Sequence, residues 1–326
     1  MRGVSDGGVF FIPGRLPAGP AGPGWRRLPR RLQCALKRLR ESHRTSMLAY
    51  RHAFHAGNHA DVLKHLVLVQ VLQYMASKDK PFRLIDTHAG GGGYALHSSQ
   101  SQKKGEYLQG ISRIWGAGDA PPAVADYLRL VRRFNPDGQL NLYPGSPALS
   151  QMLLRRGDQL RLFELHPTEF KILTENTRPG RQVQLAQVDG FAALRGQVPP
   201  SMRRGVVLMD PSYELVSDYA KVIDSLRDAL QRFAEGVYVV WYPQVSRVES
   251  IQIARRLQAT APKGWLHVRL NVQQPDAQGF GLTGSGVFVI NPPYTLHAQL
   301  AACMPWLTQK LGQFEGANHL LEHHAV

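Results

Sequence analysis

Acidic side chains and a glycine-rich string follow three apolar runs of this sequence. The string 86–93, Asp-Thr-His-Ala-Gly-Gly-Gly-Gly, follows the run 82–86, Glu164 ends the run 160–165, and Asp189 ends the run 183–189. The carboxyl ends of parallel strands form the edge at which α/β folds bind ligands. Glycines there allow a ligand close to the backbone, and we expect them to lead into a helix whose first amides face it. The sequence therefore predicts a ligand site at one edge of a sheet.

The two acids indicate which ligand this is. An acid after the second strand is suited to a ribose diol, and an acid after the third is suited to an adenine amine. Each acid can instead cap the helix that follows it, which the sequence leaves open. The glycine string lacks G-x-G-x-x-G spacing and a following Lys-Ser/Thr, which disfavours a dinucleotide fingerprint and a P-loop. Together these features predict an adenosyl cofactor.

A fourth apolar run, 205–210, ends in Asp210-Pro211-Ser212-Tyr213. The string resembles the Asp/Asn-Pro-Pro-aromatic motif of S-adenosylmethionine-dependent methyltransferases that act on amines. An exocyclic amine is a poor nucleophile, and the Asp210 carboxylate with the Pro211 carbonyl could accept its hydrogens and turn its lone pair toward a methyl donor. Tyr213 could stack on a base turned out of its surroundings. The same string is also an ordinary turn sequence.

Two observations bear on this assignment. Ser212 stands where that motif has a second proline, so the loop gains an N–H and loses a fixed φ, although both proposed acceptors remain. A closer textual match, Asn291-Pro-Pro-Tyr294, lies at the end of the last apolar run. Because it follows the final strand and not the strand after the two cofactor acids, we interpret it as a strand-to-helix turn.

Apolar runs and helical periodicity alternate along the chain. Strands are predicted at 82–86, 160–165, 183–189, 205–210, 236–242, 265–272 and 286–291. Helices are predicted at 61–76, 121–134, 147–156, 167–176, 218–233, 246–258 and 296–311. This order favours an α/β fold with a mostly parallel sheet covered on both faces. The last two strands are too close for a crossover helix and should form an antiparallel hairpin. The long segment before residue 160 predicts a small helical insertion at about 97–142.

Composition restricts the class of protein. The chain has 326 residues and a net charge of +15, from 39 Lys and Arg against 24 Asp and Glu. This favours a polyanionic partner. No apolar run is long enough to cross a membrane, and two cysteines, Cys34 and Cys303, suit a reducing compartment. We therefore expect a cytoplasmic protein.

The first 46 residues differ from the rest. Residues 1–46 carry ten Lys and Arg and two acids, and they are rich in Gly and Pro. They are predicted to be a disordered basic arm, a targeting peptide, or an extension upstream of a true start at Met47, and we favour the last. The remaining residues, 47–326, are predicted to form one domain.

The string 47–65, MLAYRHAFHAGNHADVLKH, is rich in histidine and aromatic residues. It resembles the start of the RlmJ family of 23S rRNA adenine-N6 methyltransferases. The resemblance continues through Asp-Thr-His-Ala-Gly at 86–90, Gly-Glu-Tyr-Leu at 105–108, Tyr-Pro-Gly-Ser-Pro at 143–147, Glu-Leu-His-Pro at 164–167, Asp-Gly-Phe at 189–191, Asp-Pro at 210–211 and Trp-Tyr-Pro at 241–243. It covers residues 47 to about 311.

The resemblance implies a Rossmann-like class I methyltransferase fold with a helical insertion, S-adenosylmethionine as cofactor and 23S rRNA as partner. Its implied cofactor-binding residues are His65, His88, Ser146, Glu164, Asp189, Gly190 and Asp210. Its implied catalytic residues are Asp210, Pro211 and Tyr213. Its implied RNA-contacting residues are Tyr50, His52 and Lys64. Neither a protein partner nor a membrane is implied, and we expect a monomer.

Other interpretations stay open at this point. A DNA adenine methyltransferase would use the same site, and a catalytically impaired RNA-binding homologue is suggested by Ser212. A glutamine methyltransferase would use Asn291 to Tyr294. No metal site is predicted, because His55 and His59 flank Gly57 and the string His319-x-x-Glu322-His323 lies in what we interpret as a solvated C-terminal tail. Arg203 and Arg204 precede the fourth run, at the edge of the sheet opposite Asp210.

Overall fold

The computed structural model describes residues 52–98, 101, 105–261, 263–278 and 281–324. The predicted leader, 1–46, and Tyr50 lie outside these residues. Within them, no helix combines the length and the apolar character that crossing a membrane requires.

The described chain is built on an eight-stranded sheet with the order β10-β8-β9-β7-β6-β1-β4-β5. The strands are β1 Arg83–Asp86, β4 Gln159–Phe163, β5 Val183–Ala186, β6 Gly205–Met209, β7 Val237–Gln244, β8 Trp265–Asn271, β9 Gly284–Ile290 and β10 Asn318–His324. β1, β4, β5, β6 and β7 are parallel, and β9 lies antiparallel between β7 and β8. The predicted α/β fold and the antiparallel pairing of the last two predicted strands are confirmed.

Continuous apolar runs form the central strands because both faces of the sheet are covered. In β1, Leu84 joins one hydrophobic core and the neighbouring Ile85 joins the other. In β6, Val206 and Leu208 face the first core. Alternate residues of a strand point to opposite faces, so one run of apolar residues contributes to both cores.

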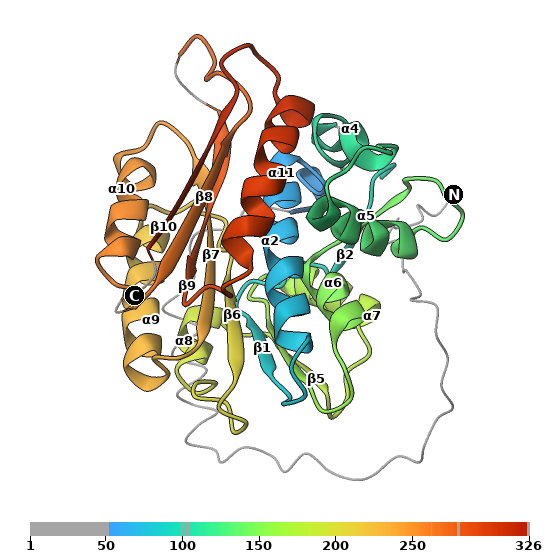
Figure 1. Ribbon diagram of the computed structural model, residues 1–326. Helices are drawn as coiled ribbons and strands as arrows, with labels where there is room; N and C mark the ends of the chain where they lie inside the picture. Colours follow the sequence, from blue (N-terminus) through green and yellow to red (C-terminus); the bar gives the residue numbers. More distant parts are fainter. Residues whose placement is uncertain (1–51, 99–100, 102–104, 262, 279–280, 325–326) are drawn as a thin grey trace, which may run out of the picture.

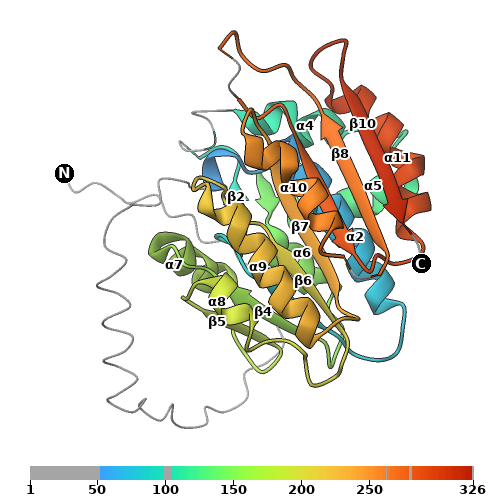
Figure 2. The ribbon, with the colours of Figure 1, turned by 90° about the vertical axis from the view of Figure 1, so that its left-hand side faces the viewer.

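Helices cover the two faces, as Figures 1 and 2 show. The helices of one face are α2 His59–Ala76, α5 Pro122–Phe134, α6 Ser146–Leu153, α7 Pro167–Asn176 and α11 Leu296–Leu311. Those of the other are α8 Gly190–Leu194, α9 Ser217–Arg232 and α10 Val248–Gln258. α2 is apolar nearly all round because it is packed between the sheet and α5, α6 and α11.

The glycine string does not lead into a helix, which corrects the prediction. Gly90 and Gly92 have positive φ, a conformation that cannot propagate a right-handed helix. The chain instead forms β2 (Gly93–Ala95), which pairs with β3 (Leu142–Pro144). η2 (Glu106–Gln109), α4 (Ile111–Trp115) and α5 lie between these two short strands, within the predicted insertion. α6, which follows β3, therefore takes the place of the crossover helix after β1.

The C-terminal segment is not a solvated tail, and this prediction was wrong. β10 pairs antiparallel with β8 along its whole length, and Leu321 packs against the first core. On a strand, His319 and His323 share one face while Glu322 points to the other. The histidines and the glutamate therefore do not converge as they would on the helix of a zinc protease.

Candidate active site

The loops that follow β1, β4, β5 and β6 meet at one edge of the sheet. Because these strands are parallel, with β1 between β4 and β6, the residues after each strand lie side by side. Asp86, Glu164, Asp189 and Asp210 are thus brought to the same edge by tertiary structure.

Glu164 supports the glycine loop. Its Oε2 accepts a hydrogen bond from the Gly90 amide at 2.8 Å, and its Oε1 accepts one from the His166 amide at 2.7 Å. Burial raises the pKa of Glu164, and these two bonds oppose the shift. The side chain is half-buried, so a partner at the edge of the sheet can still reach it.

Asp86 is a buried acid whose contacts the sequence did not reveal. The hydroxyl of Ser146, at the start of α6, donates to Asp86 Oδ2 at 2.6 Å, and the His88 amide donates to Oδ1 at 3.2 Å. Burial raises the pKa of Asp86 to about 7. Ser146, predicted to contact the cofactor, is therefore held by the carboxylate at the end of β1.

Asp189 and Gly190 bring α8 against the loop after β1. Asp189 Oδ1 accepts a hydrogen bond from the Phe191 amide at 2.9 Å and so caps α8. A Cβ at Gly190 would lie 1.9 Å from the Thr87 carbonyl oxygen, which only glycine avoids. The ring of His88 lies edge-on to Phe191, and burial lowers the pKa of His88 to about 4. Thus His88 and Asp189 are held in adjoining loops, with His88 neutral at physiological pH.

His65 is buried, and its ring contacts another side chain of the protein. Its Nδ1 is 2.7 Å from the Tyr143 hydroxyl, which is 2.9 Å from the hydroxyl of Tyr127. Burial lowers the pKa of His65 to about 3, so its ring is neutral. The histidine therefore links α2 to the helical insertion through two tyrosines.

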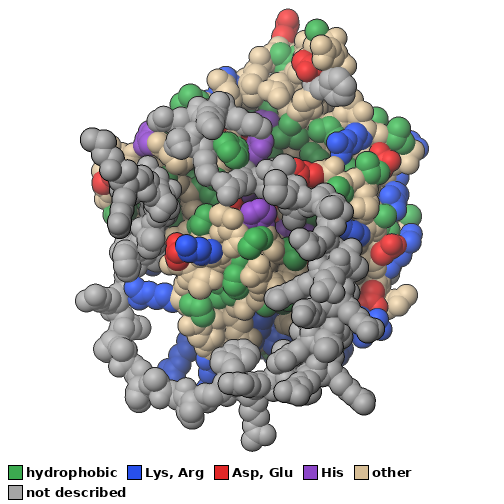
Figure 3. Space-filling model, turned by 180° about the vertical axis from the view of Figure 1, so that it is seen from behind, with side chains coloured by type: hydrophobic (Ala, Val, Ile, Leu, Met, Phe, Trp, Pro, Cys, Tyr) green, Lys and Arg blue, Asp and Glu red, His purple; other side chains and the backbone are tan. Residues whose placement is uncertain are grey.

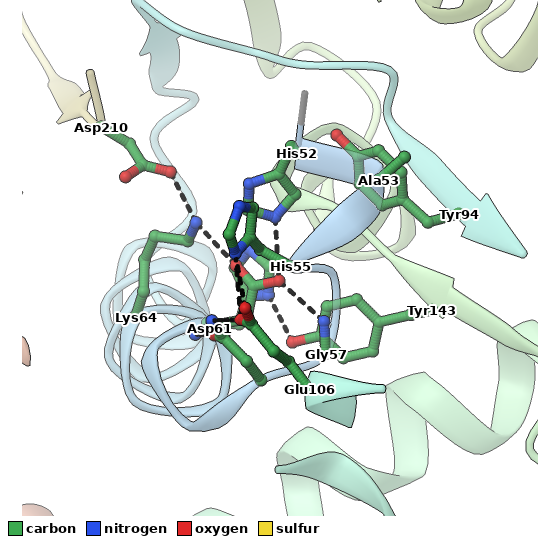
Figure 4. Close-up of polar contacts among 12 residues, drawn as sticks. His52, Ala53, His55, Gly57, Asp61, Lys64, Tyr94, Glu106, Tyr143 and Asp210 are labelled. Carbon is green, nitrogen blue, oxygen red and sulfur yellow. Dashed lines mark hydrogen bonds and ion pairs between the residues drawn. The ribbon is translucent and has the colours of Figure 1, made fainter. Parts of the chain in front are cut away.

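Four side chains form a charged network at the end of β6, as Figure 4 shows. Lys64 Nζ lies 2.5 Å from Asp210 Oδ2 and 2.8 Å from Asp61 Oδ1. Asp61 Oδ2 also accepts a hydrogen bond from the Gly57 amide at 2.9 Å and lies 2.9 Å from His52 Nε2. The buried lysine ammonium thus has two carboxylates as its partners in these contacts.

The predicted contact of Lys64 with RNA stays a prediction, and in the structure its ammonium pairs with two carboxylates in the cavity wall. Burial acts to lower the pKa of Lys64, but the charges of Asp210 and Asp61 outweigh it and raise the pKa overall. Burial raises the pKa of Asp210, and Lys64 opposes that shift. For Asp61, burial is outweighed by His52 and Lys64, and its pKa lies well below the usual value. The ammonium is committed to the two carboxylates and holds Asp210 in place.

The loop after Asp210 has an unusual conformation. Tyr213 has a φ of 52°, and its hydroxyl donates to the Trp241 carbonyl at 2.7 Å. Arg247 Nη1 donates to the Tyr213 carbonyl at 3.1 Å. The tyrosine side chain is only 3% exposed, so stacking on a base would require the ring to turn outward. In this conformation it packs against Tyr219 and Trp241 instead.

A cavity of about 420 Å³ opens beside Asp210. Its walls include His52, Asp61, Lys64, Tyr213 and Trp241. Glu164 and Asp189 do not line it. Asp210 therefore separates an aromatic and polar cavity from the loops that carry the proposed cofactor acids.

The competing string at 291–294 lies at the opposite edge of the sheet. β9 is antiparallel to β7, so its end lies beside the start of β7, and Asn291 Nδ2 donates to the carbonyls of Ala234 and Gly236. Asn291 to Tyr294 form the predicted turn between β9 and α11. This placement removes the structural basis for a glutamine methyltransferase centred on Asn291.

Comparison with known proteins assigns the chain to a family. A model described as RsmJ, Ribosomal RNA large subunit methyltransferase D, RlmJ, matches residues 79–321. The chain belongs to the RlmJ family. Ribosomal RNA large subunit methyltransferase J of Escherichia coli (strain K12) is 44% identical over 265 residues, covering 81% of this chain and 94% of that protein. The protein of the same name from Haemophilus influenzae is 43% identical over 266 residues, with the same two coverages.

A solved structure supports the same fold for this RlmJ family member. The crystal structure of a Legionella pneumophila protein matches with a TM-score of 0.75 and 32% identity, covering 82% of this chain and 98% of that one. The chain is an rRNA methyltransferase of the S-adenosylmethionine-dependent class, with a mostly parallel Rossmann-like sheet. The string at residues 47–65 and the order of the later motifs had predicted this activity and this fold.

Proposed function

We propose that the chain transfers a methyl group from S-adenosylmethionine to the exocyclic N6 amine of an adenine in 23S rRNA. The observation that carries this proposal is the position of Asp210. The carboxylate follows β6, lines the cavity beside the loops that carry Glu164 and Asp189, and lies 2.5 Å from Lys64 Nζ. A carboxylate in that position can orient an amine toward a methyl donor.

The donor set at the edge of the sheet fits an adenosyl cofactor. Glu164 offers a half-buried carboxylate after the second parallel strand, and Asp189 offers one after the third. We propose that Glu164 binds the ribose hydroxyls, Asp189 the adenine amine, and Gly190, His88, Ser146 and His65 the surrounding surface. S-adenosylmethionine, when bound, supplies an electrophilic methyl group on a sulfonium.

Asp210 and Pro211 act on the nucleophile in this proposal. Lys64 occupies Asp210 Oδ2, which leaves Oδ1 to accept one N6 hydrogen while the Pro211 carbonyl accepts the other. The N6 lone pair then forms the new N–C bond as the S–C bond breaks, and the sulfur keeps the bonding pair. The proton lost from N6 passes to water. His52 lies in the cavity wall and is proposed to contact the target nucleotide with Tyr50.

The proposed substrate also defines partners. We propose 23S rRNA as the partner of a monomeric protein, and the cytoplasm as the place where it meets that RNA. The relatives from Escherichia coli and Haemophilus influenzae are named ribosomal RNA large subunit methyltransferase J. Their name supports an RNA substrate for this chain.

Transfer of tritiated methyl groups tests the function directly. Wild-type protein should label 23S rRNA from cells that lack the modification, and digestion should yield N6-methyladenosine. Asp210→Asn should reduce kcat at least about 100-fold while retaining cofactor binding, because the carboxylate acts on the amine. Asp228→Asn, which alters an exposed ion pair with Arg232, is the matched control. Preferential labelling of duplex DNA would instead establish the DNA adenine methyltransferase.

Ser212 needs its own variant. If the cofactor binds but neither nucleic acid is labelled, Ser212→Pro separates two explanations. Labelling restored by proline would show that Ser212 impairs the loop, as in a catalytically impaired homologue. Continued absence of labelling would reject the proposed substrate.

A further inference from the structure

A cluster of arginines lies at the amino edge of the sheet, opposite Asp210. Arg155 Nη1 donates to the Ala76 carbonyl at 2.7 Å, and its Nη2 donates to the Lys80 carbonyl at 3.2 Å. Arg204 donates to the carbonyls of Lys80 and Met75. These guanidiniums fix the segment between α2 and β1 and bring the starts of β1, β4 and β6 together.

The cluster carries more positive charge than its own contacts neutralise. Burial lowers the pKa of Arg204, and nearby Arg155 lowers it further. Burial and Arg83 lower the pKa of Arg161 in the same way. Asp158, which is buried and lies 3.1 Å from Arg155, is the carboxylate that pairs with the cluster in the described residues. Arg155 and Arg204 lie close together because both donate to the Lys80 carbonyl.

Exposed cations extend this charge to the surface. Arg156 and Arg203 are exposed and follow or precede the cluster arginines in sequence. Lys78 and Lys80 are also exposed, and their backbone carbonyls accept hydrogen bonds from Arg155. The side chains of Lys80, Arg156 and Arg203 make no hydrogen bond or ion pair with another residue in the described parts of the chain. Unlike the cluster behind them, these side chains have no evident role in holding the fold.

An exposed aromatic side chain is connected to Lys78 through the ring of Tyr74. Tyr294 is 79% exposed and meets the ring of Tyr74 edge-on, with the ring centroids 5.6 Å apart. Lys78 Nζ lies 5.6 Å from the centroid of the Tyr74 ring. The two bonds from Asn291 fix the turn that presents Tyr294. We call Lys78, Lys80, Arg156, Arg203 and Tyr294 the amino-edge surface. Figure 3 shows Lys and Arg side chains in blue along the lower part of the molecule, the part where α2 leads into β1 in Figure 1.

We propose that the amino-edge surface binds rRNA outside the target nucleotide, with the cations on backbone phosphates and Tyr294 stacked on an unpaired base. Cations beside an exposed aromatic ring suit single-stranded or looped RNA, because phosphates and base faces alternate along the strand. The inference rests on the proposed function, which makes RNA the partner. In this inference the turn Asn291-Pro-Pro-Tyr294 contacts RNA at the edge of the sheet opposite Asp210 and takes no part in methyl transfer.

The length of β6 determines how long an RNA must be to reach from Asp210 to the amino-edge surface. Arg204 precedes β6 and Asp210 follows it, and six residues of extended strand span about 20 Å. At about 3.4 Å per nucleotide along one strand, this is on the order of six nucleotides even in a straight line. A short hairpin containing the target adenine should not reach the amino-edge surface, whereas a long 23S rRNA fragment should.

Charge-neutralising variants test the surface with these two RNAs. Lys78→Gln, Lys80→Gln, Arg156→Gln and Arg203→Gln are combined in one protein. This protein should bind the long fragment about tenfold more weakly, and the slope of log K against log salt should fall by about three. Its methylation of the short hairpin should change little. Tyr294→Ala should weaken binding to the long fragment about tenfold with little change in the salt slope.

A matched control removes four other positive charges. Arg129, Arg227, Arg232 and Lys310 each form an ion pair with a neighbouring aspartate, so changing them all to glutamine alters net charge equally. This control should bind the long fragment as wild type does to within about threefold. Equal losses in the two fourfold variants, or a loss on both RNAs alike, would overturn the inference. Failure of wild-type protein to methylate either RNA would instead reject the proposed function.

Discussion

Asp61 determines how Asp210, the proposed catalytic carboxylate, is held, although Asp61 lies in the wall of the cavity and not at the end of a strand. Its side chain is 2% exposed and meets Lys64, His52 and the Gly57 amide within 2.9 Å. Lys64 in turn joins Asp61 to Asp210. A buried carboxylate is tolerated here because the Lys64 ammonium, the His52 ring and the Gly57 amide contact its two oxygens.

Asp61→Asn should lower the free energy of unfolding by about 3 kcal/mol, because it removes one charge from a buried network. The kcat of methyl transfer should also fall, since Lys64 is then anchored by Asp210 alone. Urea unfolding and single-turnover assays measure the two effects. Asp126→Asn alters an exposed ion pair with Arg129 and should cost less than about 1 kcal/mol. Equal stability of the two variants would contradict the role given to Asp61.

At the scale of elements, α8 helps to position the proposed cofactor-binding edge through the close approach of two backbones. Gly190, the first residue of α8, lies against the Thr87 carbonyl, and Thr87 lies between Asp86 and His88. No side chain fits between these segments. The short helix therefore couples the loop after β5 to the loop after β1.

Gly190→Ala should weaken S-adenosylmethionine binding about tenfold, because the added methyl group must push α8 away from the loop that carries His88. Isothermal titration measures this affinity. Gly196→Ala is the matched control, since its Cβ would meet the Ala193 carbonyl oxygen at an ordinary 3.6 Å. Wild-type affinity in Gly190→Ala would show that the close approach is not needed for the cofactor.

At the scale of the whole molecule, the described residues include four histidines with lowered pKa values and three acids with raised pKa values that affect stability near pH 5. Burial lowers the pKa of His59, His88 and His267 to about 4 and that of His65 to about 3. In the unfolded chain a histidine binds a proton near pH 6.5. Between about pH 4 and 6.5 the unfolded chain therefore binds more protons at these four sites than the folded protein does.

Acids with raised pKa values act in the opposite direction. Asp86, with its pKa near 7, is protonated in the folded protein and charged in the unfolded chain at pH 5, and Glu164 and Asp210 are shifted the same way. The protons taken up on unfolding by the four histidines outnumber the protons released by the three acids. The free energy of unfolding should thus fall as the pH is lowered from 6.5 to 5, with net proton uptake on unfolding. Urea titrations at several pH values check this, and rising stability on acidification would contradict it.

The central strands and the acids at their ends could be predicted from sequence because they depend on short segments. Residues 205–210 read as a buried strand, and β6 is Gly205–Met209, with Asp210 following it. The order of motifs also identified the RlmJ family. The glycine loop was mispredicted because the two positive-φ glycines were read as the start of a helix. β10 was missed because its seven residues are stabilised by pairing with β8, which is distant in the sequence.

Sequence alone thus determined the α/β class, the strand ends that carry Glu164 and Asp210, and the family, because apolar periodicity and motif order are local properties of the chain. Only the tertiary structure decided that Lys64 pairs with Asp210 across 146 positions and that the Tyr213 ring is buried. It alone brought Arg155 and Arg204 together at the far edge. These contacts depend on how distant segments pack, and packing fixes which charges share a buried space.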